Sequence, residues 1–134
     1  MNVINIFENN NSPLEVHSDA RGVIADVFYN SVINHVALIN SNPEAIRGNH
    51  YHKESTQHML ITSGELEYWY KQLDSTEPAQ MYLAKAGDLI TTPAYEIHAL
   101  RITDKGNQFV VFSEGKRGGE DYESDTFRVD SIIG

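Results

Sequence analysis

Clusters of turn-forming residues interrupt this 134-residue chain at short intervals, and they constrain its fold more than any other feature. Segments such as SDARG, SNPE, KAGD and DKGN separate runs that are rich in Val, Ile, Tyr, Phe and Thr, the residues that favour strands. The runs predict strands near 3–7, 23–29, 35–40, 45–53, 57–63, 65–73, 79–85, 88–92, 97–103 and 107–113. Because no segment keeps a helical apolar period over about 11 residues, we expect an all-β sandwich or barrel. The segment SGE at 63–65 is expected to join two strands as a tight hairpin, with Gly64 able to supply a positive φ where the turn needs one.

The composition excludes several classes of protein. The chain carries 19 acidic and 10 basic residues, a net charge of −9, and has no basic stripe for a nucleic acid. It has no cysteine, which excludes disulfides, thiolate metal sites and a cysteine nucleophile. No apolar run approaches the roughly 18 residues of a membrane span, and the first residues do not read as a signal peptide. We therefore expect one domain over residues 1–134, in the cytoplasm, without a membrane or nucleic acid partner.

Two histidines two positions apart are the first sign of a functional site. His50 and His52 are expected to point to one face of a strand, together with Ile46, while Arg47 takes the other face. On the next strand, Gln57 shares its face with apolar residues. The apolar neighbours place the histidine face inside the predicted barrel, where two histidines would make a polar pocket.

Two segments resemble the signature motifs of the cupin superfamily. In the first, His50-Tyr51-His52 is followed by four residues, Gln57, six residues and Gly64. In the second, Gly87 is followed by five residues, Pro93, and then His98 at the expected position. The sequence departs from the pattern at three positions: Glu44 stands in place of the leading Gly, Gln57 in place of an acidic residue, and Tyr95 in place of a Gly. The resemblance implies a cupin-type double-stranded β-helix, which is a jelly-roll barrel.

The matched positions bind a divalent metal ion in cupins, so the resemblance implies a metal site at His50, His52, Gln57 and His98. Imidazole ligands suit Zn, Ni, Fe and Mn. The neutral amide of Gln57 replaces a carboxylate, so a dication should be bound less tightly than in an acidic site.

A narrower resemblance concerns the segment RGNHYHK, which begins at Arg47. With DARG at 19–22 and YESDTFRVDSII at 122–133, it resembles the nucleotide-sugar 3,4-ketoisomerases of the cupin superfamily. Similar openings occur in the deoxysugar 3,5-epimerases, and a related RGNHYH segment occurs in metal-binding cupin domains of capsular-polysaccharide enzymes. The resemblance implies an isomerase or epimerase that acts on a 4-keto sugar or nucleotide sugar. His50 and His52 would be its acid and base, with Arg47 in the same motif; Tyr51 replaces the Ala that usually separates the histidines.

Two other functions use the same residues and remain open at this point. One is a metal-dependent cupin with oxygenase, lyase or isomerase activity, and the other is a non-catalytic module that binds a sugar or small acid.

Tyr95 is a candidate gate or proton donor near the barrel mouth, and His58 is expected to face outward. A homodimer is expected, because pairing hides edge strands. The polar tail after residue 114 is expected to cover an edge or reach a partner subunit.

Overall fold

The computed structural model describes residues 1–8, 13–115 and 119–134. Its strands are β1 (Asn2–Asn5), β2 (Val16–Asp19), β3 (Gly22–Ala25), β4 (His35–Ser41), β5 (Ile46–Tyr51), β6 (Thr56–Gln72), β7 (Gln80–Lys85), β8 (Asp88–Thr92), β9 (Glu96–Glu114) and β10 (Phe127–Arg128), with one short helix, α1 (Gly119–Ser124). In these ranges, no helix is long and apolar enough to cross a membrane.

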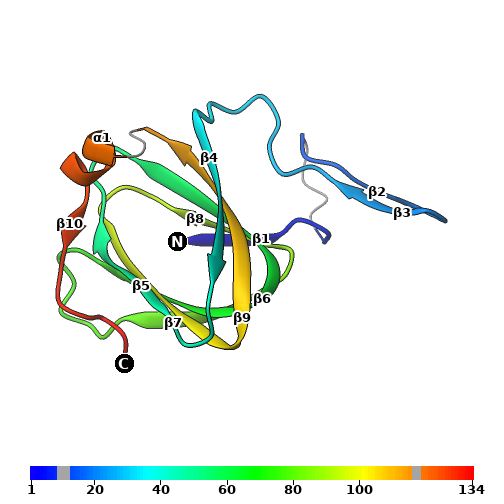
Figure 1. Cartoon of the computed structure of the whole chain (residues 1–134). Coiled ribbons are helices and arrows are strands. Elements are labelled where there is room, and N and C mark those ends of the chain that lie inside the picture. The colour runs from blue at the N-terminus through cyan, green and yellow to red at the C-terminus, as the bar shows by residue number, and fades with distance from the viewer. Residues whose placement is uncertain (9–12, 116–118) are drawn as a thin grey trace.

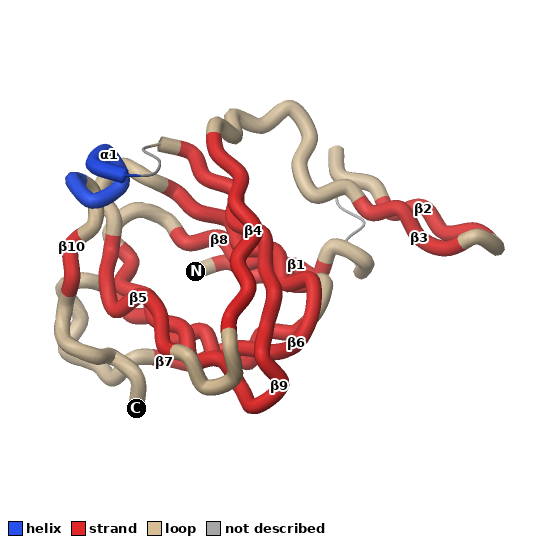
Figure 2. Tube along the Cα trace, viewed as in Figure 1, coloured by secondary structure: helices blue, strands red, loops and turns tan. Residues whose placement is uncertain are grey.

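Two long strands, β6 and β9, hold the barrel together by running through both of its walls (Figure 1). The first half of β6 and the second half of β9 lie with β1, β8 and β4 in one wall. Their other halves lie with β7, β5 and β10 in the second wall. All these pairs are antiparallel, and the tube in Figure 2 shows the two walls facing each other across the interior. The predicted all-β jelly-roll barrel of the cupin type is confirmed.

The two walls meet at Gly64, where the sequence predicted a hairpin turn. The hairpin is wrong: the predicted strands at 57–63 and 65–73 form one continuous strand that ends at Gln72, and its register shifts on both sides of Gly64. Gly64 does have a positive φ, of 73°, and faces Asn107 of β9. A Cβ at Gly64 would lie 2.1 Å from the carbonyl oxygen of Gly106. The glycine signal therefore marks a bend with a close backbone approach, and the DKGN segment likewise bends β9 without ending it.

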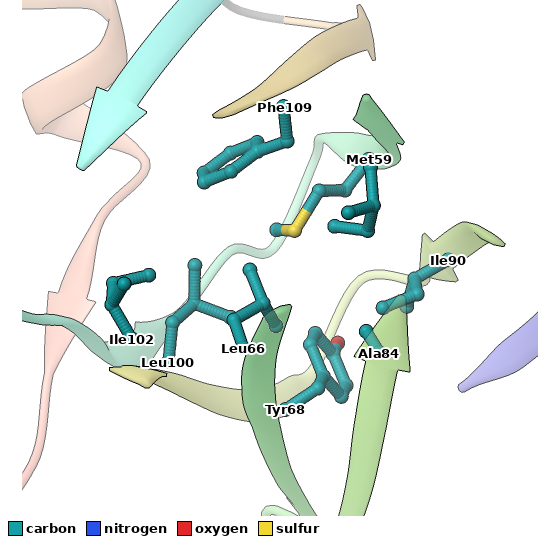
Figure 3. Close-up of a cluster of buried hydrophobic side chains, with 9 residues drawn as sticks. Met59, Leu66, Tyr68, Ala84, Ile90, Leu100, Ile102 and Phe109 are labelled. Atoms are coloured by element: carbon teal, nitrogen blue, oxygen red, sulfur yellow. The ribbon is translucent and has the colours of Figure 1, made fainter. Parts of the chain in front are cut away.

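The core fills space between the two walls of the barrel. Nine buried side chains form it: Met59, Ile61, Leu66, Tyr68, Ala84, Ile90, Leu100, Ile102 and Phe109 (Figure 3). They come from β6, β7, β8 and β9, so residues distant in the sequence share one interior. Tyr68 is fully buried, and its hydroxyl bonds to Thr92 and to Glu96, 3.3 Å away, which satisfies this polar group inside the core.

The hairpin of β2 and β3 projects away from the barrel (Figure 1). The sequence predicted a strand over 23–29 and none over 16–19; in the structure β3 ends at Ala25, and β2 pairs with it. After β3 the chain turns back to the barrel, where the Phe28 ring packs at 5.0 Å from His58 and 4.9 Å from Phe112. This outer-face contact accounts for the early end of β3, because Phe28 must leave the hairpin to reach the barrel.

Candidate active site

A β-bulge in β5 decides which side chains enter the interior. Gly48 pairs with Ala99, but His50 pairs with His98, so Asn49 is an extra residue, with φ 57°. Arg47 pairs with Leu100 and therefore lies on the same face as His50. The prediction that Arg47 takes the opposite face was wrong, because it assumed an uninterrupted alternation. Ile46 pairs with Arg101 on the other face and is 58% exposed, although it borders the mouth of the cavity described below.

Three histidines meet inside the barrel and form what we name the histidine cluster: His50, His52 and His98. Each offers a ring nitrogen within 4.8 Å of the others, and the ring centroids are 4.7 to 5.5 Å apart. The Nδ1 of His52 lies 2.9 Å from the carbonyl oxygen of Asp125, and the Nδ1 of His98 lies 3.2 Å from that of Glu96. Because a carbonyl oxygen only accepts, the Nδ1 of each ring is the donor, and Nε2 is the nitrogen left to face the other members of the cluster.

The surroundings of the cluster keep two of its members neutral. Burial lowers the pKa of His50 to about 4, with further lowering by the nearby His52 and by Arg128. Burial also lowers the pKa of His98 to about 3, and His50 adds to this effect. At neutral pH both rings are therefore unprotonated, the state required of a general base or of a metal ligand.

The cluster lies at a cavity of about 520 Å³, within the usual size range of small-molecule sites. His50, His98 and Gln57 line the cavity, whereas the predicted His52 is buried and is not among the lining residues; core residues such as Met59 and Phe109 form part of the apolar wall. The other lining residues are His35, Ala37, Ile39, Ile46, Arg47, Gly48, Leu100, Val111, Ser113 and Arg128. Among the residues that the structure describes, the lining thus includes two arginines and no carboxylate, although the chain as a whole carries a charge of −9.

The two cavity arginines are held differently. The Nε of Arg47 donates to Ser41 Oγ at 2.9 Å, and one of its terminal nitrogens lies 3.3 Å from the Asn40 carbonyl oxygen; both partners are neutral. Arg128 comes from β10, where it pairs directly with His50 of β5, and its two terminal nitrogens bond to the Glu123 carboxylate at 3.0 and 3.1 Å. The sequence reasoning did not select Arg128, although the resemblance of residues 122–133 pointed to this segment.

The C-terminal segment also braces His52 through Asp125. This buried carboxylate accepts hydrogen bonds from the backbone N–H groups of Lys53, Glu54 and Ser55 and from the Ser55 hydroxyl, at 2.9 to 3.2 Å. Burial alone would raise the pKa of Asp125, but the bonds from Lys53, Ser55 and Glu54 outweigh it and hold the pKa below its ordinary value. The predicted covering role of the tail thus takes a specific form: residues 125–128 pack against the connection that carries His52.

Tyr95 and His58 lie outside the cavity lining. Tyr95 is half exposed in the turn before β9, with φ 69°, and its N–H donates to the carbonyl oxygen of His52 at 2.7 Å. Its backbone therefore supports His52, whereas its predicted role as gate or proton donor stays a prediction. His58 faces away from the interior, as predicted, and bonds to Thr91 at 2.8 Å and Glu114 at 3.1 Å.

The residues of the cluster fit a divalent metal ion. Metal–nitrogen distances of about 2.0–2.1 Å require ligand nitrogens roughly 3.3 Å apart in a tetrahedral site, so the three rings need only a small closure from their present spacing. The Nδ1 atoms of His52 and His98 each contact a backbone carbonyl oxygen, and such contacts commonly orient the imidazole rings that bind a metal ion. Gln57, in the same cavity, offers an amide oxygen as a fourth donor.

Several solved structures share this fold. A 3,4-ketoisomerase from Helicobacter canadensis is 16% identical, with a TM-score of 0.74 over 96% of this chain and 90% of that one. The 3'-monoepimerase ChmJ from Streptomyces bikiniensis, solved with dTDP-quinovose, is 14% identical, with a TM-score of 0.72 over 89% of this chain and 68% of that one. The capsular polysaccharide assembling protein CapF from Staphylococcus aureus is 18% identical, with a TM-score of 0.65 over 90% of this chain.

This chain spans only 34% of CapF. No curated protein matches the sequence. The family described as the polysaccharide biosynthesis C-terminal domain matches residues 17–126, which include the whole histidine cluster. The match covers well over half of the sequence, and the barrel agrees with the predicted cupin fold. The chain belongs to the family of polysaccharide biosynthesis C-terminal domains.

Proposed function

We propose that the chain is an isomerase or epimerase that acts on a 4-keto sugar carried by a nucleotide, with His50 and His52 as its acid and base. The observation that carries the proposal is the histidine cluster beside a cavity whose described lining contains two arginines and no carboxylate. The histidines supply proton transfer, and the arginines suit an anionic substrate. The similar folds of a 3,4-ketoisomerase and a 3'-monoepimerase support the same class of reaction.

The reaction needs a base next to the carbonyl. Moving a carbonyl from C4 to C3 begins when a base takes the proton from C3, and the electron pair of that bond forms an enediolate with the C4 oxygen. Proton return to C4, with exchange of the hydroxyl protons, gives the 3-keto sugar; return to C3 on the other face gives the epimer. His50 is unprotonated at neutral pH and can take the first proton. His52 does not line the cavity and is 2% exposed, but its ring centroid lies 4.9 Å from that of His50, so it would act as the second group by passing a proton to or from His50.

Charge in the cavity links substrate binding to the basicity of His50. Arg128 lowers the pKa of His50, after burial and His52, whereas Glu123, which pairs with Arg128, raises it. An anionic group that carries more charge than the Glu123 carboxylate would offset Arg128 more fully and raise the pKa of His50 toward neutrality, where a general base works best. The substrate's own charge would therefore improve the base that attacks it.

The test is proton exchange at C3. We would incubate the protein with dTDP-4-keto-6-deoxyglucose in D₂O and follow the C3 proton signal by NMR. We expect exchange that is catalysed by the parent, falls at least about a hundredfold in His50→Asn or His52→Asn, and is unchanged in His17→Asn, whose ring is 71% exposed on the β2–β3 hairpin. Absence of exchange with any keto sugar would refute the proposal. Tight ligand binding without exchange would instead identify a non-catalytic binding module.

A metal-dependent reaction is the second candidate, and the spacing of the histidine cluster favours it. His50, His52 and His98 would hold a divalent ion such as Zn, Ni, Fe or Mn, with Gln57 as a further donor. When bound, such an ion would polarise the carbonyl of the substrate and stabilise the enolate. Metal analysis of protein purified without chelator, compared with His98→Ala and with His17→Asn, tests the site. About one equivalent that is lost only in His98→Ala supports it, whereas a parent that stays metal-free after refilling refutes it.

We also propose a homodimer that buries the β2–β3 hairpin. In the described part of the chain this hairpin pairs with no other strand, and Val23 and Ile24 on it are 50% and 68% exposed. An isolated hairpin is marginally stable in water, so a second copy that covers these side chains would stabilise it. Sedimentation equilibrium should give twice the chain mass for the parent and a weaker dimer for Ile24→Asp. A monomeric parent would contradict the proposal.

A further inference from the structure

The ion pair at the mouth of the cavity joins the site to the C-terminal segment. Arg128 lines the cavity and pairs across the strands with His50, so the two side chains share one face of the sheet. Figure 1 shows β10 and α1 together beside β5, at the edge of the barrel. Glu123, at the end of α1, occupies both terminal nitrogens of Arg128. The Glu123 carboxylate therefore already binds the guanidinium group of Arg128, a residue that lines the cavity.

We propose that Arg128 recognises the diphosphate of the substrate, and that Glu123 occupies Arg128 until the diphosphate replaces it. This inference rests on the proposed function and names which residue reads the anionic end of the ligand. Glu123 competes with the diphosphate for the guanidinium group of Arg128, so it lowers the affinity for the substrate without contacting the sugar.

The exposure of the pair makes the exchange favourable. The side chains of Arg128 and Glu123 are 63% and 56% exposed, and ion pairs this exposed contribute little. A diphosphate carries more negative charge than one carboxylate and offers several oxygens to the planar guanidinium fork. The substrate can therefore displace Glu123, while the same pair keeps Arg128 in place when the cavity is empty.

The charge distribution explains why a local cation is needed. The chain has a net charge of −9, so its overall field repels an anionic ligand. Arg47 and Arg128 are the arginines that line the cavity among the described residues, and the partners of Arg47 are neutral oxygens. Removing Glu123 would thus raise the positive charge at the mouth, and removing Arg128 would halve the number of arginines there.

The two partners therefore have opposite effects in a binding test. With thymidine diphosphate as the probe in isothermal titration calorimetry, we expect Arg128→Gln to raise the dissociation constant about tenfold, and Glu123→Gln to lower it about threefold. Arg128→Lys, which keeps the charge but not the fork, should fall between the parent and Arg128→Gln. Arg101→Gln is the matched control: Arg101 pairs with Glu67 at 2.8 Å on the outer face, and its loss should leave the dissociation constant unchanged.

The outcomes separate this inference from the proposed reaction. Unchanged binding in Arg128→Gln, weaker binding in Glu123→Gln, or a parent that does not bind thymidine diphosphate would overturn the inference, even if sugar proton exchange is observed. Arg128-dependent binding without exchange would sustain the inference and refute the proposed reaction. Inorganic pyrophosphate and glucuronate serve as further probes. Arg128-dependent binding of glucuronate alone would show that the residue reads a sugar carboxylate, and would overturn the assignment to a diphosphate.

Discussion

Replacing Asp125 by Ala should destabilise the protein by about 3 kcal/mol. The carboxylate is 3% exposed and accepts four donors, three of them backbone N–H groups of residues 53–55. Lys53 and Glu54 are exposed, so water can replace this acceptor for them at little cost. Ser55 is buried, and both its N–H and its hydroxyl lose this acceptor, at roughly 1–3 kcal/mol for each. For a chain of this length, about 3 kcal/mol corresponds to a melting temperature lower by roughly 10 °C.

Thermal unfolding followed by circular dichroism measures this effect. Asp125→Asn keeps one acceptor oxygen and should lose about half as much stability as Asp125→Ala. Asp130→Ala is the control, because Asp130 is exposed and follows the same segment. A melting temperature within about 2 °C of the parent for Asp125→Ala would refute the reasoning, since it would mean that the connection before β6 does not depend on this carboxylate.

Three further predictions follow from the bend, the buried histidines and the metal ligands. Gly64→Ala should cost more than about 3 kcal/mol or prevent folding, because its Cβ meets the Gly106 carbonyl oxygen at 2.1 Å; Gly22→Ala, also at positive φ but in open space, should cost less in the same urea titration. The pKa values of His50 and His98 are lowered in the folded protein, so the unfolded chain takes up these protons at a higher pH than the folded protein does. The free energy of unfolding of chelator-treated protein should therefore fall as the pH drops from about 6.5 to 4, by up to about 1.4 kcal/mol per pH unit for each histidine. A flat profile would contradict this. Adding Zn²⁺ to that protein should raise its melting temperature, and an unchanged value would count against the metal site.

The sequence alone predicted the architecture well, because its signals are local. Strand-forming runs between turn clusters anticipated most of the barrel strands, and the alternation around Gln57 and His58 placed one inside and the other outside. The glycine at position 64 was recognised as able to supply a positive φ, and it adopts one. Its role was misjudged, because a hairpin turn and a bend within a long strand require the same backbone conformation, and only the pairing of β6 with β9 separates them.

The sequence predicted those residues of the candidate site that can be recognised by their spacing along the chain. His50, His52, Gln57 and His98 were selected because their spacing matches the cupin motifs; the structure brings the three histidines together and places His50, His98 and Gln57 in the cavity lining. Arg47 was selected from its motif but assigned to the wrong face. The bulge at Asn49 reverses the alternation by one residue, and such a bulge depends on the partner strand.

The contribution of the C-terminal segment was decided by tertiary structure alone. Asp125 and Arg128 lie more than 70 residues after the histidines that they contact or flank. Side-chain periodicity says which residues share a face within one strand, but it does not say which distant segment will cover that face. The strands and the metal-type spacing could thus be read from the sequence. The charge of the cavity mouth and the bracing of His52 arise only when the chain end returns to β5 and hydrogen bonds form between the two segments.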